Sequence, residues 1–232
     1  MFDYTNAIVR TPALSVVDGL RADGGEGPDY QGLIAEHSAY VEILRALGLQ
    51  VDVLPPAHDY PDSIFVEDPA LVFTEGAIVL NLAAASRAGE ADLIVPALES
   101  HFEHVLRMAG PGHADGGDVL VLPDRVIIGL SNRTDREGAE ELIGLLEQLG
   151  KKGQIAETPP GVLHFKTGCS LIDEETVFAL PQMADSPAFN GLKVVPVPAG
   201  EEKAANKLRI RDAALIAAHF PKSREIIEAH GV

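Results

Sequence analysis

The chain has 232 residues, 46% of them hydrophobic, which is enough to pack the core of one large domain or two small ones. Its 35 acidic and 18 basic residues give a formal charge of −17, which disfavours nucleic acid and anionic membranes and favours small cationic ligands. The single cysteine, Cys169, excludes an internal disulfide and a cysteine-rich metal site. With no apolar run of membrane-spanning length and no secretory pattern at its start, the sequence predicts a cytoplasmic protein.

Five repeated units follow one another along the chain, with a loose period because their connecting loops differ in length. Each reads as a β-branched strand, a loop, a helix with apolar residues at three- and four-residue spacing, and a glycine that stops the helix. In chain order they occupy residues 6–56, 76–102, 125–150, 175–200 and 213–232. In the fourth unit, residues 175–200, the helix is reduced to a short turn. Such units bury a sheet face only by associating in a row or a ring, so we predict a single α/β domain over residues 1–232.

A glycine-rich segment, DGLRADGGEGPD at residues 18–29, interrupts the first unit. It lacks both the Lys-Ser/Thr of a phosphate-binding loop and a strand-to-helix junction at the right spacing. We therefore predict a lid over a pocket, with Leu20 covering a ligand and Asp23, Glu26 and Asp29 exposed to water.

The segment PDSIFVEDPAL, residues 61–71, places Asp62, Glu67 and Asp68 among apolar residues. If it is extended, side chains alternate between faces, so at least one of these acids lies near apolar packing. A desolvated carboxylate is costly unless a cation meets it. The segment therefore predicts a bound cation.

Other motifs carry weaker signals. His101 and His104, in HFEH, lie at i and i+3 on a predicted helix but have no third ligand nearby in sequence, so we interpret them as surface histidines and expect neither a metal nor another cofactor. Asp118 fits an ordinary Asp-Gly turn in ADGGDVL. Arg87 and Arg133 each follow an apolar strand, where they could pair with surface acids or lie on a shared rim.

Six segments, in order, resemble the dimethylarginine dimethylaminohydrolase family, within the arginine deiminase and amidinotransferase superfamily. They are PDSIFVEDPAL, ESHF, ADGGDVL, IIGLSNRTDREGAEEL, VLHFKTGCSL and AAN, and they span essentially the whole chain. The resemblance implies a five-bladed α/β propeller of ββαβ units with pseudo-fivefold symmetry. It also implies a central pocket for a free guanidino amino acid, whose guanidinium would be the predicted cation.

The resemblance further implies a catalytic pair. His164 would be the acid–base residue that protonates the departing amine. Asp115, at a position where relatives often have Glu, would orient and polarise His164 with a shorter reach.

The resemblance also assigns residues to each end of the substrate. Asp68, helped by Glu67, would hold the guanidinium by paired hydrogen bonds, with Asp62 and Phe65 lining the same wall. The substrate's α-carboxylate would be held by the guanidinium groups of Arg87 and Arg133.

The chain departs from the family pattern at the nucleophile. Relatives carry the reactive Cys in a short segment near the C terminus, after the fifth helix and its strand, whereas this chain ends at Val232. Cys169 reads as a small buried hydrophobe with an inert thiol. We therefore expect an incomplete last blade, a chain that is a fragment rather than naturally short, and no citrulline from these 232 residues alone.

A second departure is the segment AANKLRIRD, where relatives tend to have an apolar or thiol residue in place of Lys207. Lys207, Arg209 and Arg211 alternate along a predicted strand. They would crowd one face of that strand with positive charge.

Three functions are compatible with these motifs. The preferred one is hydrolysis of an Nω-methylated arginine, such as dimethylarginine, to citrulline and an alkylamine through a covalent Cys thiouronium. The alternatives are a related hydrolase of guanidino or ureido amino acids, either an arginine deiminase or a citrulline-cleaving enzyme, and a catalytically inactive guanidino-ligand-binding propeller. The sequence leaves the oligomeric state open, a homodimer included.

Overall fold

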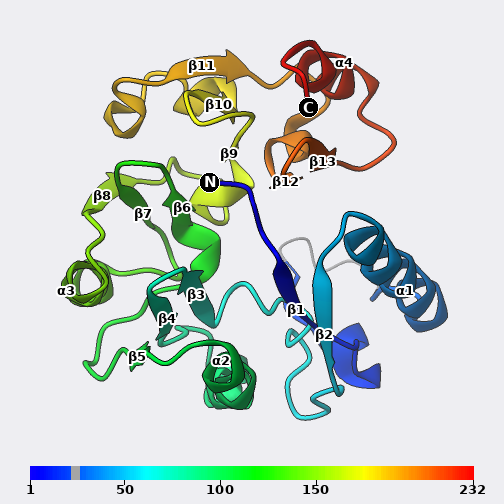
Figure 1. The fold of residues 1–232 in the computed structure, drawn as a ribbon, viewed down its shortest axis with the longest axis vertical. Helices are drawn as coiled ribbons and strands as arrows, with labels where there is room; N and C mark the ends of the chain where they lie inside the picture. Colours follow the sequence, from blue (N-terminus) through cyan, green and yellow to red (C-terminus); the bar gives the residue numbers. More distant parts are fainter. Residues whose placement is uncertain (22–26) are drawn as a thin grey trace. The chain divides into compact units, whose positions relative to one another are not determined.

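The computed structural model describes residues 1–21 and 27–232 (Figure 1). Contacts divide it into two compact units, Tyr4–Arg107 and Met108–Val232, the second of which includes Met1–Asp3. Each unit has its own sheets and its own apolar core. The single domain over residues 1–232 stays a prediction.

The Tyr4–Arg107 unit contains two small sheets. In one, β1 and β2 pair in parallel. In the other, β4 lies between β3, which is antiparallel to it, and β5, which is parallel to it. The elements are β1 (Asn6–Arg10), α1 (Tyr30–Ala46), β2 (Gln50–Leu54), β3 (Ala70–Phe73), β4 (Gly76–Val79), α2 (Val95–His101) and β5 (Val105–Arg107), with 3-10 helices at Leu14–Asp18, Ala85–Arg87 and Glu90–Leu93.

Local sequence signals set the bounds of both α-helices in this unit. Asp29, expected in the exposed lid, is the N-cap of α1, and its carboxylate accepts a hydrogen bond from the Gly32 N–H at 2.8 Å. The helix predicted in the second unit, residues 76–102, divides into a 3-10 helix and α2. Pro96, in the first turn of α2, has no N–H, which suits a helix start and opposes a continuous helix. The predicted lid residues Asp23 and Glu26 lie outside the described residues.

The Met108–Val232 unit contains two three-stranded sheets and one hairpin. The sheet orders are β6-β7-β8, β11-β10-β9 and β12-β13. The elements are β6 (Val119–Val121), β7 (Val126–Leu130), α3 (Arg136–Gln148), β8 (Gly153–Glu157), β9 (Cys169–Leu171), β10 (Thr176–Ala179), β11 (Lys193–Pro196), β12 (Leu208–Ile210), β13 (Ala213–Leu215) and α4 (Pro221–Ala229), with 3-10 helices at Gly116–Asp118, Phe165–Thr167, Pro181–Met183, Pro187–Phe189 and Glu202–Ala205.

All three three-stranded sheets share one pattern: an antiparallel hairpin, a helical crossover, and a third strand parallel to the second. This confirms the repeated units read from the sequence. In the sheet of β9, β10 and β11 the crossover holds only two 3-10 helices, at Pro181–Met183 and Pro187–Phe189, as the worn-down helix predicted. The repeat pattern in the sequence did not predict the first strand of each hairpin as a separate element.

The central strand of each of these sheets lies in the core. Every residue of β4 and β10 is buried, as are residues 126–129 of β7. A strand covered on both faces needs apolar side chains at every position, which explains why these segments read as continuous hydrophobic runs.

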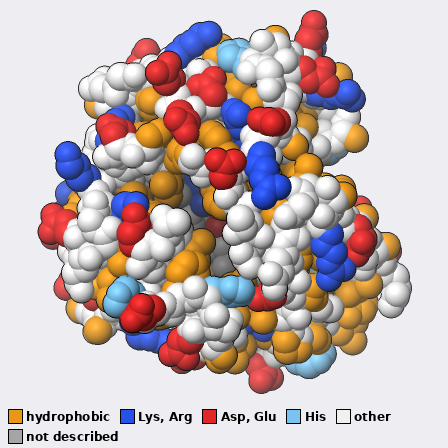
Figure 2. Space-filling view, viewed as in Figure 1, with side chains coloured by type: hydrophobic (Ala, Val, Ile, Leu, Met, Phe, Trp, Pro, Cys, Tyr) orange, Lys and Arg blue, Asp and Glu red, His pale blue; other side chains and the backbone are white. Residues whose placement is uncertain are grey.

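On the face drawn in Figure 2, acidic side chains are interspersed with basic and apolar side chains and form no single patch. Within residues 1–21 and 27–232, no helix has the length and apolar character needed to cross a membrane.

Candidate active site

Residues 61–69 of the acidic segment fold as consecutive turns, and strand β3 begins only at Ala70. The Phe65 N–H donates to the Asp62 carbonyl at 3.0 Å, and the Asp68 N–H donates to the Phe65 carbonyl at 3.2 Å. Turns do not alternate side chains between two faces, so the premise of an extended segment was wrong. The burial of acids was right, because the Asp62 residue is only 6% exposed and the Asp68 side chain only 15%.

Asp68 forms an ion pair with the guanidinium of Arg87, a residue of the same unit. Arg87 Nη1 lies 2.5 Å from Asp68 Oδ2, and Arg87 also binds Glu90 through Nη2–Oε1 at 2.5 Å and Nε–Oε2 at 2.8 Å. Its Nη2 further donates to the carbonyls of Phe65 and Asp62. Burial alone would lower the pKa of Arg87, but the carboxylates of Glu90 and Asp68 outweigh it and raise that pKa.

These contacts do not support the role expected for Arg87. We expected its guanidinium to hold a substrate carboxylate, yet it is 6% exposed and its donors face two side-chain carboxylates and two carbonyls. The planar fork of a guanidinium suits such bidentate pairing. Arg87 therefore holds the acidic segment in shape and fixes one oxygen of Asp68.

Asp62 and Leu20 are also brought together. The Leu20 N–H donates to both carboxylate oxygens of Asp62, at 3.0 and 3.3 Å. A Cβ at Gly19 would lie 2.8 Å from Asp62 Oδ1, so a larger residue there would require that carboxylate to shift. The Leu20 side chain itself is exposed, and its contact with a ligand stays a prediction.

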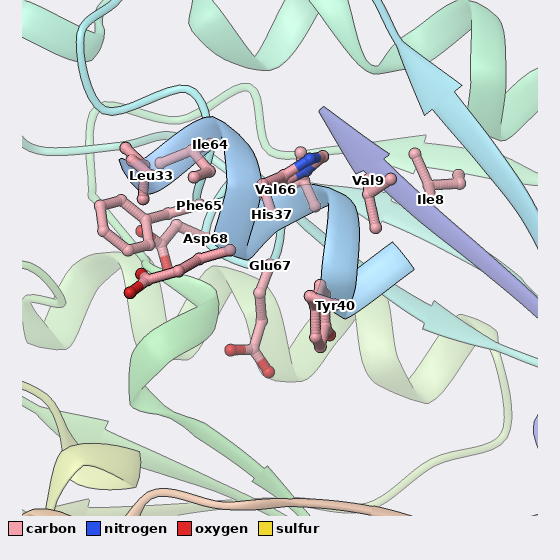
Figure 3. Close-up of a pocket in the computed structure, with 11 residues that line it drawn as sticks. Ile8, Val9, Leu33, His37, Tyr40, Ile64, Phe65, Val66, Glu67 and Asp68 are labelled. Atoms are coloured by element: carbon pink, nitrogen blue, oxygen red, sulfur yellow. The ribbon is translucent and has the colours of Figure 1, made fainter. Parts of the chain in front are cut away.

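A groove of ≈ 380 Å³ contains three of the predicted binding residues (Figure 3). Phe65, which is 56% exposed, lines it together with Glu67 and Asp68. The full lining is Ile8, Val9, Leu33, Glu36, His37, Tyr40, Ile64, Phe65, Val66, Glu67 and Asp68. The groove thus combines an apolar lining with carboxylates, which suits the apolar stem and cationic end of a guanidino amino acid.

One wall of the groove comes from α1 and was missed from the sequence. Leu33, His37 and Tyr40 face the acidic segment from that helix (Figure 3). Burial raises the pKa of Tyr40, and the Glu67 carboxylate raises it further. Their spacing of four and three residues places them on one helix face and could have identified them.

In the Met108–Val232 unit, the imidazole of His164 lies beside two buried carboxylates. His164 Nδ1 is 3.9 Å from Asp115 Oδ1, the expected partner, and 3.4 Å from Asp118 Oδ2. Asp118 is fully buried, and it was interpreted from the sequence as a turn residue. The signal that could have found it was its position three residues after Asp115 in the same motif.

Glycine lets the imidazole approach this motif. A Cβ at Gly117 would lie 2.9 Å from Cγ of His164 and 3.1 Å from Asp115 Oδ1. The His164 backbone N–H donates to the Thr167 hydroxyl at 3.2 Å, at the start of the 3-10 helix Phe165–Thr167. The missing side chain at Gly117 thus leaves room for the His164 ring beside Asp115.

Arg133 belongs to a loop that is bonded to the same motif. Its backbone N–H donates to the Ser131 hydroxyl at 2.9 Å, and that hydroxyl donates to Asp118 Oδ2 at 2.7 Å. Arg133 is half-buried, and its contact with a substrate carboxylate stays a prediction.

Cys169 is a core residue in β9. It is 0% exposed, and its thiol donates to the Phe165 carbonyl at 3.4 Å. Burial raises the pKa of the Cys169 thiol despite nearby Lys166 and Lys207. A thiol that remains protonated is a poor nucleophile.

Lys207 and Arg209 do not simply crowd one strand face, because both reach carbonyls at the end of β9. Lys207 Nζ donates to the Leu171 carbonyl at 2.5 Å and to the Ser170 hydroxyl at 3.0 Å, while Arg209 donates to the Ile172 carbonyl. Burial lowers the pKa of Lys207 to about 7, and the positive charge of Arg209 lowers it further. The expected crowding of positive charge therefore contributes to the lowered pKa of Lys207.

Replacing Lys207 with Met should stabilise the protein most at acidic pH. The folded pKa of about 7 lies below the ordinary value of 10.5. The unfolded chain therefore binds more protons between those values, and wild-type stability rises with pH across that window. Each pKa unit corresponds to about 1.4 kcal/mol, so we expect a gain of a few kcal/mol at pH 6 that shrinks at pH 9.

Urea denaturation at pH 6, 7, 8 and 9 measures this difference. Lys203→Met, an exposed lysine on the 3-10 helix Glu202–Ala205, is the matched control and should change stability by less than about 0.5 kcal/mol. A Lys207→Met effect that does not vary with pH would contradict the prediction.

A family model and two known proteins match this chain. The family model described as N,N dimethylarginine dimethylhydrolase, eukaryotic, matches residues 29–150. A dimethylarginine dimethylaminohydrolase from Pseudomonas aeruginosa is 34% identical over 229 residues, covering 98% of this chain and 90% of that protein. One from Streptomyces coelicolor is 33% identical, covering 95% and 85%.

The chain belongs to the dimethylarginine dimethylaminohydrolase family. A solved structure of the Pseudomonas aeruginosa family member in complex with citrulline superposes with a TM-score of 0.94 at 33% identity, over 98% of this chain and 90% of that one. A second family structure, an adduct with S-methyl-L-thiocitrulline, also gives 0.94. ArgZ, a cyanobacterial arginine dihydrolase, shares only the fold, with a TM-score of 0.83 at 15% identity. The fold is the α/β propeller of the arginine deiminase and amidinotransferase superfamily.

Proposed function

We propose that the protein hydrolyses an Nω-methylated arginine to citrulline and an alkylamine. The observation that carries the proposal is the His164 imidazole held 3.4 and 3.9 Å from two buried carboxylates, in a chain of this family. A histidine in that setting can protonate a departing amine and then activate water. The family members solved with citrulline and with S-methyl-L-thiocitrulline support a ligand of the same shape.

The acidic segment holds the guanidinium in this proposal. Asp68, with one oxygen fixed by Arg87, offers its other oxygen to the planar cation, and Glu67 adds a second carboxylate on the same groove. Phe65 supplies an apolar wall, and Asp62 anchors Leu20 as cover through the Leu20 backbone.

His164 carries the proton transfer, Asp115 orients and polarises it, and Arg133 holds the α-carboxylate. A thiolate adds to the guanidinium carbon, His164 protonates the alkylamine as the C–N bond breaks, and water then releases citrulline from the thiouronium. The burial of Cys169 removes it from this role, and the attacking thiolate is assigned to no described residue. The cytoplasmic location and the homodimer stay predictions.

A citrulline assay tests the proposal. The product of the complete reading frame, incubated with asymmetric dimethylarginine, should form citrulline and dimethylamine in equal amounts. Arginine as substrate tests for deiminase activity, and ornithine formed from citrulline tests for a ureido hydrolase. Turnover of arginine or citrulline without turnover of dimethylarginine would overturn the proposal.

Replacing Asp68 with Asn should weaken dimethylarginine binding, because it removes the charge that meets the guanidinium. Loss of one charge-assisted hydrogen bond costs about 1.5 to 3 kcal/mol, roughly a 10- to 150-fold rise in Kd. Calorimetry with norleucine, which lacks the guanidino group, should show little change. Asp92→Asn, at an acid with a 66% exposed side chain in the same unit, is the control. Equal losses for both ligands would rule out the guanidinium contact.

A further inference from the structure

The β12–β13 hairpin depends on side chains for its polar links to the end of β9. In the described part of the chain, β12 pairs with β13 and with no other strand. A two-stranded hairpin is only marginally stable by itself. Lys207 and Arg209 connect it to β9 by donating hydrogen bonds to the carbonyls of Leu171 and Ile172. A segment with so few backbone partners opens at a lower free-energy cost than the core strands do.

The surroundings of the Lys207 amine suit its neutral form. Lys207 is only 9% exposed and directly precedes β12. Its amine donates to the Leu171 carbonyl at 2.5 Å and to the Ser170 hydroxyl at 3.0 Å. That hydroxyl donates its own proton to the Ala205 carbonyl at 2.6 Å, so it accepts from Lys207. A neutral amine has two N–H groups, which these two oxygens satisfy, whereas an ammonium has a third.

The charges around Lys207 also fail to compensate an ammonium. Burial lowers the pKa of Lys207, and the positive charge of Arg209 in β12 lowers it further. Cys169 and Asp173 act in the opposite direction, but the pKa still falls to about 7. Among the described residues, no acidic side chain forms an ion pair with this amine, and the Phe178 ring lies 5.9 Å from it. A proton on Lys207 is therefore poorly stabilised in the closed hairpin.

We propose that Lys207 is a pH-sensitive switch, which holds the β12–β13 hairpin closed as a neutral amine and promotes local opening of the hairpin as an ammonium. Opening exposes the amine to water, where it binds a proton readily. Between about pH 7 and pH 10.5 the open hairpin thus binds more protons than the closed one, so opening becomes easier as the pH falls and levels off below about 7. The inference goes beyond the proposed function and does not depend on it.

Hydrogen exchange followed by mass spectrometry tests the inference on the product of the complete reading frame. Exchange is measured at pH 6, 7, 8 and 9 and corrected for the intrinsic pH dependence of amide exchange. The opening constant of residues 208–215 should rise roughly 5- to 10-fold for each unit by which the pH is lowered from 9 to 7, and then level off. The amides of β7, a buried central strand of the same unit, should respond less.

Lys207→Met should remove this pH dependence, so that the hairpin stays closed at pH 6 as it does at pH 9. Lys203→Met, at an exposed lysine on the 3-10 helix Glu202–Ala205, is the matched control and should keep the wild-type response. A response that persists in Lys207→Met would overturn the inference. An equal response in β7 would also overturn it, because the opening would then be global rather than local.

NMR of the wild type covers the case in which Lys207→Met does not fold. In protein with 13C-labelled lysine, the Cε signal of one lysine should titrate with a midpoint at a pH of about 7, the pKa of the buried Lys207. Exposed lysines titrate near pH 10.4. If every lysine titrates near that value, Lys207 is charged at neutral pH and the inference fails.

Discussion

His164→Ala should lose about 10²- to 10⁴-fold of the citrulline-forming rate, the range that one positioned acid–base residue contributes. Without the imidazole, the alkylamine would have to leave unprotonated, and water would lack a base at the thiouronium. The rate is measured by colorimetric detection of citrulline with the product of the complete reading frame. KM for dimethylarginine should change little, because the guanidinium and carboxylate contacts remain.

Cys169→Ser is the matched control for His164→Ala, because Cys169 is assigned no role in the reaction. Its thiol is fully buried and donates only to the Phe165 carbonyl among the contacts described for it, a bond that a serine hydroxyl can also make. Turnover should therefore persist. Abolished turnover in Cys169→Ser, with full activity in His164→Ala, would show that both roles are wrongly assigned.

Arg87→Met should lower the free energy of unfolding by about 3 to 5 kcal/mol, because it leaves the buried Glu90 without its hydrogen-bonded cation. Glu90 is 2% exposed and takes two bonds from Arg87, while Asp68 takes a third. If Arg87 instead served only a substrate carboxylate, its loss would weaken binding and leave stability nearly intact. Urea denaturation separates the two roles.

Two further variants test the origin of this loss. Arg87→Met combined with Glu90→Gln should recover part of the stability, since the buried charge of Glu90 is then removed and only Asp68 is left without its cation. Arg107→Met removes an exposed partner of Asp92 and should cost no more than about 1 kcal/mol. A similar loss in Arg107→Met and Arg87→Met would remove the case for a structural role of Arg87.

The sequence predicted the repeated units because their apolar periodicity is local. The strands at the centre of each sheet are continuous apolar runs, and the ends of α1 coincide with Asp29 and Gly48, a capping acid and a glycine with φ of 85°. The motifs around Asp68, Asp115 and His164 also predicted acids and a histidine that the structure buries wholly or in part. Such features depend on residues a few positions apart.

Only the tertiary structure decided which charges meet. The side chain of Arg87 reaches back to Asp68, 19 residues earlier, and Asp118 lies beside His164, 46 residues later. Turns at residues 61–68, unlike a strand, direct Asp68 to Arg87 rather than to an opposite face. Burial then decides the chemistry, because desolvation makes the Cys169 thiol inert and Lys207 a weak base whatever their neighbours in sequence. The sequence determined which chemical groups this protein has, and the fold determined their partners and their exposure to water.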